Sequence, residues 1–227
     1  MSKFPYGVDA APVPALLGAA GVACLAAARG RIALTASGAI LLAHAGVYLH
    51  TTLRGKLRIW ERELDRVGLN GDEQLLDLGC GRGVVLIEAA RRLPSGHAVG
   101  VDLWTADQSG NRPEATLANA AAAGVADRVE VRTADMTELP FADGSFDVVT
   151  AAMAIHNIGS AEGRYRAVDE AMRVLRPSGQ LIIADISPMA RRYAAHLGHG
   201  TLRPLGPGYW YGSPLLSVTL LRAVKPD

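Results

Sequence analysis

The chain of 227 residues carries a formal net charge of +1, and its residues are 49% hydrophobic but only 5% aromatic. This length accommodates one ordinary domain with an appendage, and the absence of a concentrated basic run argues against nucleic acid as a partner. The two cysteines, Cys24 and Cys80, have neither the spacing of a metal site nor that of a disulfide framework, so we expect no bound metal.

The first fifty residues contain two long stretches without charge. Positions 10–28 and 32–53 hold no Asp, Glu, Lys or Arg, and the sequence Arg29-Gly30-Arg31 separates them. A membrane-spanning helix needs about 20 mostly apolar residues. We therefore predict an apolar helical hairpin over residues 1–53, in or through the membrane, with its turn at Gly30. The alternatives are a signal peptide, a re-entrant hairpin that does not cross, and a pair of soluble helices packed over the next domain.

Residues 54–67 have the pattern of an amphipathic helix that links the hairpin to the rest of the chain. Its apolar residues recur at spacings of three and four, with charges between them: Leu57, Trp60, Leu64 and Val67. This helix is suited to lie at the membrane surface, to pack on the next domain, or to do both. Together with the apolar hairpin, the basic residues of this helix predict a protein of the cell membrane whose domain of residues 54–227 faces the cytoplasm, although Arg29 and Arg31 in the turn oppose that orientation.

After Gly68, short apolar runs alternate with helical stretches. This alternation is typical of an α/β fold in which an open, mostly parallel sheet has helices on both faces. Strands are predicted at 74–78, 98–103, 129–133, 146–151, 180–186 and 215–223, and helices at 84–93, 113–123, 162–174 and 189–197. Such sheets bind their ligands outside the carboxyl ends of the strands.

Three of the predicted strand ends carry an aspartate: Asp77, Asp102 and Asp135. After Asp77, glycines stand at positions 79, 81 and 83, which is G-x-G-x-G and not the G-x-G-x-x-G of a pyrophosphate-binding dinucleotide fold. A carboxylate at Asp102, about 20 residues beyond the glycine turn, can accept both hydroxyls of a ribose. A loop cap or a helix N-cap is the alternative role for any one of these aspartates.

Residues 72–186 resemble the class I S-adenosylmethionine-dependent methyltransferases, most of all the branch of ubiquinone, menaquinone and small-molecule methyltransferases. The matching stretches are LDLGCGRG at 76–83, GVD at 100–102, ADMTELPFADGSFDVV at 134–149 and RVLRPSGQLIIAD at 173–185, with AIHNI at 154–158 more loosely. This resemblance covers about half of the chain. It implies a Rossmann-like seven-stranded sheet with an antiparallel last strand.

The same resemblance implies S-adenosyl-L-methionine as methyl donor and S-adenosyl-L-homocysteine as product. Leu103 and the backbone of Met136 would then meet the adenine ring, and Asp135 its amino group. By motif position the cofactor contacts are Asp77, Gly79, Gly81, Arg82, Asp102, Leu103, Asp135, Met136 and Ala152. The chain departs from the family by an insertion at 104–112, which either shapes the substrate pocket or is an ordinary solvent loop.

Methyl transfer needs a base only when the nucleophile carries a proton. His156, just beyond the fourth strand, is the candidate for that base, and Asn157 beside it is a candidate for orienting a substrate oxygen. The alternative role of His156 is to shape the pocket or cap the following segment. Further candidates for the acceptor site lie near the C-terminus, with core or surface roles as their alternatives: His196, His199, Tyr209, Trp210 and Tyr211.

These features together predict a membrane-associated S-adenosylmethionine-dependent methyltransferase that acts on a hydrophobic small molecule or lipid. One alternative is the same enzyme class acting on a soluble small molecule, with the N-terminal helices as a lid or a dimer contact. The other is a membrane scaffold that binds the cofactor without catalysis.

Overall fold

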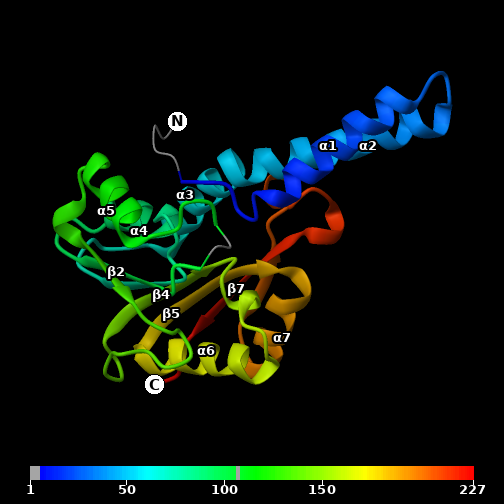
Figure 1. The fold of residues 1–227 in the computed structure, drawn as a ribbon. Helices are drawn as coiled ribbons and strands as arrows, with labels where there is room; N and C mark the ends of the chain where they lie inside the picture. The colour runs from blue at the N-terminus through cyan, green and yellow to red at the C-terminus, as the bar shows by residue number, and fades with distance from the viewer. Residues whose placement is uncertain (1–5, 106–107) are drawn as a thin grey trace.

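The structure is a computed structural model that describes residues 6–105 and 108–227. A seven-stranded sheet of order β3-β2-β1-β4-β5-β7-β6 forms its centre (Figure 1). The strands are β1 Gln74–Leu78, β2 His97–Asp102, β3 Val129–Thr133, β4 Phe146–Ala152, β5 Leu175–Ile186, β6 Thr201–Pro204 and β7 Val218–Val224. β1 to β5 are parallel, while β7 runs antiparallel to β5 and β6. The predicted Rossmann-like sheet is thereby confirmed.

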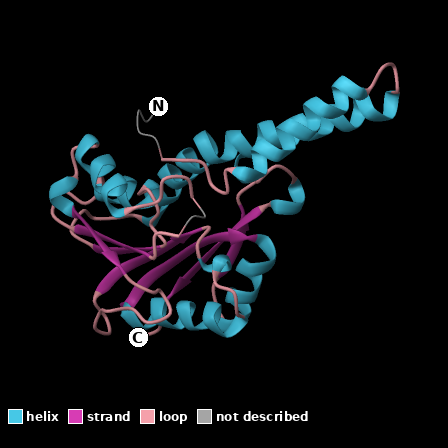
Figure 2. Ribbon diagram, viewed as in Figure 1, coloured by secondary structure: helices cyan, strands magenta, loops and turns pink. Residues whose placement is uncertain are grey.

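Helices cover both faces of this sheet (Figure 2). On one face lie α3 Lys56–Val67, α4 Val84–Ala90 and α5 Pro113–Ala122, and on the other α6 Ala161–Val174 and α7 Ser187–Leu197. Because both faces of β1 are covered, its Leu75, Leu76 and Leu78 are fully buried, as expected for a central parallel strand. Short helical turns complete the chain at η2 Ala126–Arg128, η3 Ile155–Asn157, η4 Pro207–Tyr209 and η5 Pro214–Leu216.

The N-terminal region forms the predicted helical hairpin. Helix α1 spans Pro12–Ala27 and α2 spans Ile32–His50, with Gly30 at φ +81° in the turn between them. The two helices touch at Gly21 and Gly38, where a Cβ on Gly38 would lie 2.9 Å from the carbonyl oxygen of Gly21. The absence of both side chains lets the backbones meet, and the hairpin extends well away from the sheet (Figure 1).

Helix α2 does not stop before the linking helix. It runs through a π-helical segment, η1 Thr51–Gly55, directly into α3, so that residues 32–67 form one continuous helix. The linking helix packs on the next domain, since Trp60, Leu64 and Val67 belong to the core around α4. Its contact with a membrane surface stays a prediction.

Candidate active site

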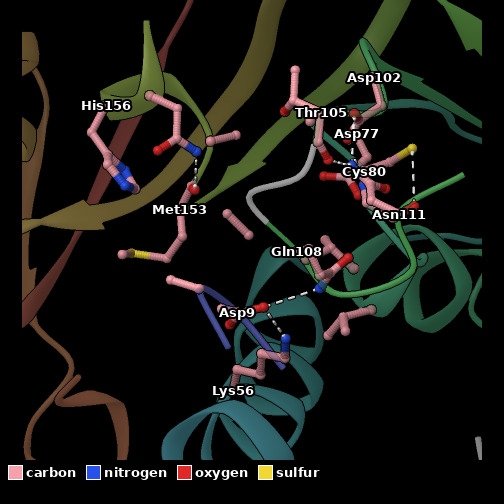
Figure 3. Close-up of a pocket in the computed structure, with 18 of the residues that line it drawn as sticks. Asp9, Lys56, Asp77, Cys80, Asp102, Thr105, Gln108, Asn111, Met153 and His156 are labelled. Carbon is pink, nitrogen blue, oxygen red and sulfur yellow. Dashed lines mark hydrogen bonds and ion pairs between the residues drawn. The ribbon is translucent and has the colours of Figure 1, made fainter. Parts of the chain in front are cut away.

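A cavity of about 650 Å³ opens at the carboxyl ends of β1, β2 and β4 (Figure 3). This volume lies in the range of small-molecule and cofactor pockets. Its walls contain the two catalytic candidates and every predicted cofactor contact except Arg82: Asp77, Gly79, Gly81, Asp102, Leu103, Asp135, Met136, Ala152, His156 and Asn157. The sequence motifs, which are spread over eighty residues, therefore converge on one place.

The glycine loop after β1 forms one wall of the cavity. The amides of Gly79 and Cys80 both donate to the carbonyl oxygen of Val101, at 2.8 and 3.1 Å, and this pair of bonds holds the loop against β2. Gly79 has φ +66°, and a Cβ there would lie 2.3 Å from Cβ of Ala154. Only glycine tolerates both this dihedral angle and this close approach. The loop therefore packs directly against Ala154, just past the end of β4.

Asp102 ends β2 with a carboxylate that is held in place by three N–H groups. Oδ2 accepts from the amide of Gly81 at 2.8 Å, while Oδ1 accepts from the amide of Trp104 at 2.6 Å and from Nδ2 of Asn111 at 3.2 Å. Only 8% of the residue is exposed, and it lines the cavity. A carboxylate has about four lone-pair positions, so it retains capacity to accept from a ligand.

Asp77 is fully enclosed at the end of β1, where its Oδ1 accepts from Oγ1 of Thr150 at 2.8 Å. Burial raises the pKa of this carboxyl to about 7, although the hydrogen bond from Thr150 acts in the opposite direction. Asp77 is thus poised to change charge near neutral pH, and a cation bound beside it would favour the ionised form.

Asp135 follows β3 and faces the cavity from an exposed turn. Its Oδ1 accepts from the amide and from Oγ1 of Thr137, both at 2.8 Å. The capping role considered as an alternative is therefore real for this residue. It does not exclude a ligand contact, since Asp135 also lines the cavity.

Arg82 is placed differently from the other predicted residues. Its side chain turns to the insertion, where Nη1 donates to the carbonyl oxygen of Ser109 at 3.0 Å, and its amide donates to Oε1 of Gln108 at 2.9 Å. The insertion is part of the pocket, because Thr105, Gln108 and Asn111 line the cavity. Ala106 and Asp107 of the same insertion lie outside the described residues.

His156 sits in η3, just past the end of β4. Its Nδ1 lies 2.7 Å from Oδ1 of Asp185, a contact of ion-pair length whose angle departs from that of an ideal hydrogen bond. Asp185 is completely buried at the end of β5, and its carboxylate also accepts from the amides of His156 and Ile186 and from the hydroxyl of Tyr193. The ring of His156 reaches the cavity with this carboxylate behind it.

The C-terminal candidates divide into two groups. Tyr209 and Tyr211 are buried and line the cavity. Trp210, His196 and His199 are not among its lining residues; His196 instead pairs with Asp169 at 2.7 Å and stacks on a neighbouring tyrosine.

A cluster that the sequence did not reveal closes the side of the cavity below the hairpin. Asp9 accepts from Nζ of Lys56 at 2.7 Å, from Nε2 of Gln108 at 3.0 Å and from the hydroxyl of Tyr211 at 2.8 Å. Burial tends to raise the pKa of the Asp9 carboxyl, but the charge of Lys56 and these hydrogen bonds bring it below its ordinary value. We call these four residues the Asp9 cluster; they come from four separate segments of the chain, and Figure 3 shows Asp9 with its bonds to Lys56 and Gln108.

The charges in the cavity favour a cationic ligand. Four carboxylates line it, those of Asp9, Asp77, Asp102 and Asp135. Among the described residues on its wall, Lys56 is the only lysine or arginine, and it is paired with Asp9. This set suits the ammonium and sulfonium groups of S-adenosylmethionine better than the phosphates of a dinucleotide. The described part of the chain holds no group of three His, Cys, Asp or Glu side chains arranged for a metal ion.

Comparison with known proteins agrees with this geometry. Residues 76–183 match a family model described as "Methyltransferase domain". The ubiquinone/menaquinone biosynthesis C-methyltransferase UbiE of Roseobacter denitrificans is 34% identical over 133 residues, which are 58% of this chain and 50% of that protein. The nocamycin O-methyltransferase of Saccharothrix syringae is 38% identical over 141 residues, 60% of this chain and 46% of that protein. The chain thus spans about half the length of these curated relatives.

Solved structures share the fold at lower identity. A geranyl diphosphate methyltransferase in complex with GPP and sinefungin superposes with a TM-score of 0.58 at 20% identity, covering 73% of this chain and 77% of that one. The [4+2]-cyclase SpnF superposes with a TM-score of 0.60, also at 20% identity, over 73% of this chain and 81% of the other. At these identities the likeness concerns the fold alone.

Proposed function

We propose, on the premise that residues 76–183 form a class I S-adenosylmethionine-dependent methyltransferase domain, that the protein transfers a methyl group to a hydrophobic small molecule or lipid. The observation that carries the proposal is the convergence of Asp77, Asp102 and Asp135, at three strand ends, on one cavity that His156 also reaches. If each of these aspartates only capped a loop or a helix, nothing would require all of them to line the same cavity.

The cofactor's parts match the polar groups along the wall. The carboxylate of Asp102, fixed by the amides of Gly81 and Trp104, would accept the ribose hydroxyls. Asp77 would face the cationic amino-acid end, and Asp135 the adenine. When bound, S-adenosylmethionine supplies an electrophilic methyl group on a good leaving group, so the protein's task is alignment of the reactants and exclusion of water.

His156 is placed to remove a proton from the methyl acceptor. With Nδ1 turned to Asp185, the ring's other nitrogen, Nε2, is free to accept that proton. Asp185 is a positioning residue: its buried carboxylate orients the ring and stabilises it once it is charged. This arrangement favours an acceptor whose nucleophile carries a proton, such as a hydroxyl or a thiol. Asn157, exposed at the mouth of the cavity, is placed to orient an oxygen of the acceptor.

A hydrophobic acceptor and a membrane location are supported by the hairpin. Its surface carries large apolar side chains with high exposure, among them Ile32 at 85% and Leu16 at 69%. Within the helix Ile32–Val67, only 17% of the most apolar 18-residue stretch is buried, whereas a core helix of a soluble protein is mostly buried. With 16 and 19 residues, α1 and α2 are roughly 24 and 29 Å long, close to the hydrocarbon thickness of about 30 Å.

The orientation we propose keeps the catalytic domain in the cytoplasm. Arg54, Arg58 and Arg62 are exposed at four-residue spacing along the same helix, just outside the apolar part, where they can meet anionic headgroups. Lys56 does not contribute to this basic face, because it is buried against Asp9. The division into a membrane hairpin, residues 1–53, and a catalytic domain, residues 54–227, follows the same reasoning.

Calorimetry with S-adenosylmethionine and S-adenosylhomocysteine tests the cofactor assignment. We expect both to bind the wild-type protein, and Asp102→Ala to weaken binding about 100-fold, because a pair of charged hydrogen bonds is lost. Asp127→Ala is the matched control, since Asp127 is an exposed aspartate in η2. Absence of binding, or equal affinity of Asp102→Ala, would refute the proposal.

A radiolabelled methyl-transfer screen tests the acceptor. Lipid and aqueous extracts of the source cell are compared with the same enzyme preparation, and we expect labelled product in the lipid extract. Label in the aqueous extract alone would favour a soluble acceptor, with the hairpin serving as a lid. Cofactor binding without transfer to either extract would favour the scaffold.

A further inference from the structure

The lining residues that are exposed to solvent form two groups of opposite character. The first group is mainly polar and follows β2, β3 and β4: Leu103, Thr105, Asp135 and Asn157. The second is wholly apolar and lies at the base of the hairpin: Ala10, Val13 and Leu216. We call the second group the apolar rim. Val13 is 40% exposed and Leu216 46%, so the cavity wall reaches the surface there.

The apolar rim is joined to the catalytic residues by short connections. The amide of Ser187, two residues after Asp185, donates to the carbonyl oxygen of Ser217 at 2.9 Å, which places Leu216 beside the end of β5. On the other side, the hydroxyl of Tyr211 donates to Asp9 at 2.8 Å, and the backbone amide of Tyr211 donates to the carbonyl oxygen of Leu216. One loop thus connects the start of the hairpin to the element that carries the partner of His156.

Outside the rim, apolar surface continues without a covering segment in the described structure. Leu16 follows Val13 by three residues, so the two lie on one side of α1. Leu215, next to Leu216, is 91% exposed. A leucine this exposed beside other apolar residues is typical of a surface that meets a membrane or an apolar partner.

We propose that the apolar rim is the site at which a single alkyl or prenyl chain of the acceptor leaves the cavity and continues along α1 into the bilayer. The inference rests on the proposed function and adds to it: the acceptor is an amphiphile whose head reaches His156 while its tail stays in lipid. Since a chain loses little hydrophobic energy in passing from lipid to an apolar wall, such an acceptor reacts without being extracted from the membrane.

The structure favours a lipid chain over a second protein molecule at this place. The rim is one opening of the cavity that His156 also lines, and a partner's side chain seated there would occlude the route of the acceptor. The apolar surface also leads directly onto the hairpin, which we assign to the membrane on separate grounds. An interface with a second protein would need neither a cavity behind the rim nor an apolar surface that continues from the rim onto the hairpin.

Photocrosslinking of the full-length protein in phospholipid vesicles tests the site. The reagent is a phenol carrying a long saturated chain with a diazirine near its end, and the labelled residues are mapped by mass spectrometry. We expect labelling within residues 10–16 and 213–217. An unlabelled phenol with the same chain should compete, while phenol itself should not. Leu216→Asp and Val13→Asp should each reduce labelling about tenfold, because a charge is costly at an apolar contact.

Leu117→Asp on α5 is the matched control, since Leu117 is also an exposed leucine but lies away from the rim. Labelling spread evenly over the hairpin, or unchanged in Leu216→Asp, would overturn the proposal, as would labelling near Asp135 and Asn157. S-adenosylhomocysteine binding by calorimetry is measured on each variant and should be unaffected. If the wild-type protein binds no S-adenosylhomocysteine but labels at the rim, the methyltransferase assignment fails while the chain-binding site stands.

Discussion

Nζ of Lys56 lies 2.7 Å from Oδ1 of Asp9, at the point where the hairpin joins the domain that contains the sheet. The lysine comes from the long helix, the aspartate from the segment that precedes α1. Both residues line the cavity, and Asp9 also holds Tyr211 and Gln108. The position of the hairpin and the shape of the candidate active site therefore depend on the same ion pair.

We expect Lys56→Met to lower the free energy of unfolding by about 2–4 kcal/mol, because it leaves a mostly buried carboxylate without its cation. The range is below that of a fully buried pair, since 22% of the Asp9 side chain is exposed. Urea denaturation at neutral pH measures the change. The double variant Asp9→Asn with Lys56→Met should recover part of the loss, and equal stability of single and double variants would contradict the explanation.

The ion pair of Asp9 and Lys56 also predicts how the stability of the fold changes as the pH falls. Because the pKa of Asp9 is lowered in the native state, its contribution to stability is complete above the ordinary value of 3.8 and is lost as the pH falls through the lower native value. The difference in stability between wild type and Lys56→Met should shrink on acidification. A difference that stays constant down to the lowest pH at which the protein folds would refute this.

Asp77 predicts a pH dependence of the opposite sign. Its pKa of about 7 exceeds the ordinary 3.8, so the native state binds the proton more tightly than the unfolded state does. Stability should therefore fall as the pH rises between these two values, by at most about 4 kcal/mol from this group. Asp77→Asn should flatten that part of the curve in urea denaturation at pH 4 to 8. An unchanged slope in the variant would show that Asp77 titrates elsewhere.

His156→Asn should lower kcat by about 100- to 10,000-fold with little change in KM, because it removes the proposed base without changing the cavity walls much. Asp185→Asn should give a smaller loss and a shifted pH profile of kcat, as expected for a residue that acts through the ring. Tyr193→Phe is the control, since it contacts the same carboxylate. A rate for His156→Asn within threefold of wild type would exclude the base.

Ile32→Asp and Ile40→Asp should each weaken membrane association, because they place a charge on the exposed apolar surface of α2. Flotation of the protein with vesicles on a density gradient measures binding, with Leu117→Asp as the matched control. If the wild-type protein stays at the bottom of the gradient and elutes as a dimer in gel filtration, the hairpin is a contact between subunits.

Much of the fold could be predicted from local patterns. Strand β1, with Asp77 and the glycines after it, lies where the sequence indicated, because a buried parallel strand followed by a glycine turn is a local signal. The start of β5 at Leu175, earlier than the expected residue 180, depends on its pairing with Phe146 of β4. No pattern within residues 175–179 reports that pairing.

The parts of the site that were missed depend on tertiary contacts. Asp185 closes the last matched motif, but nothing in that motif shows that it stands behind His156. Asp9 and Lys56 are 47 positions apart, and Lys56 resembles any other base in the flank of an apolar stretch. Arg82 stands in the glycine loop, and its guanidinium donates to the carbonyl oxygen of Ser109 in the insertion. Its contact with the cofactor stays a prediction.

The continuous helix from Ile32 to Val67 has a consequence for how this chain can vary. Each residue added to a helix rotates everything beyond it by about 100° and advances it by about 1.5 Å. One residue inserted between Tyr48 and Thr52 would turn the hairpin about its axis while leaving every strand intact. The length of this helix therefore fixes the rotational orientation of the hairpin relative to the sheet. Changes of length within the helix should be far less tolerated than the same changes at the turn around Gly30.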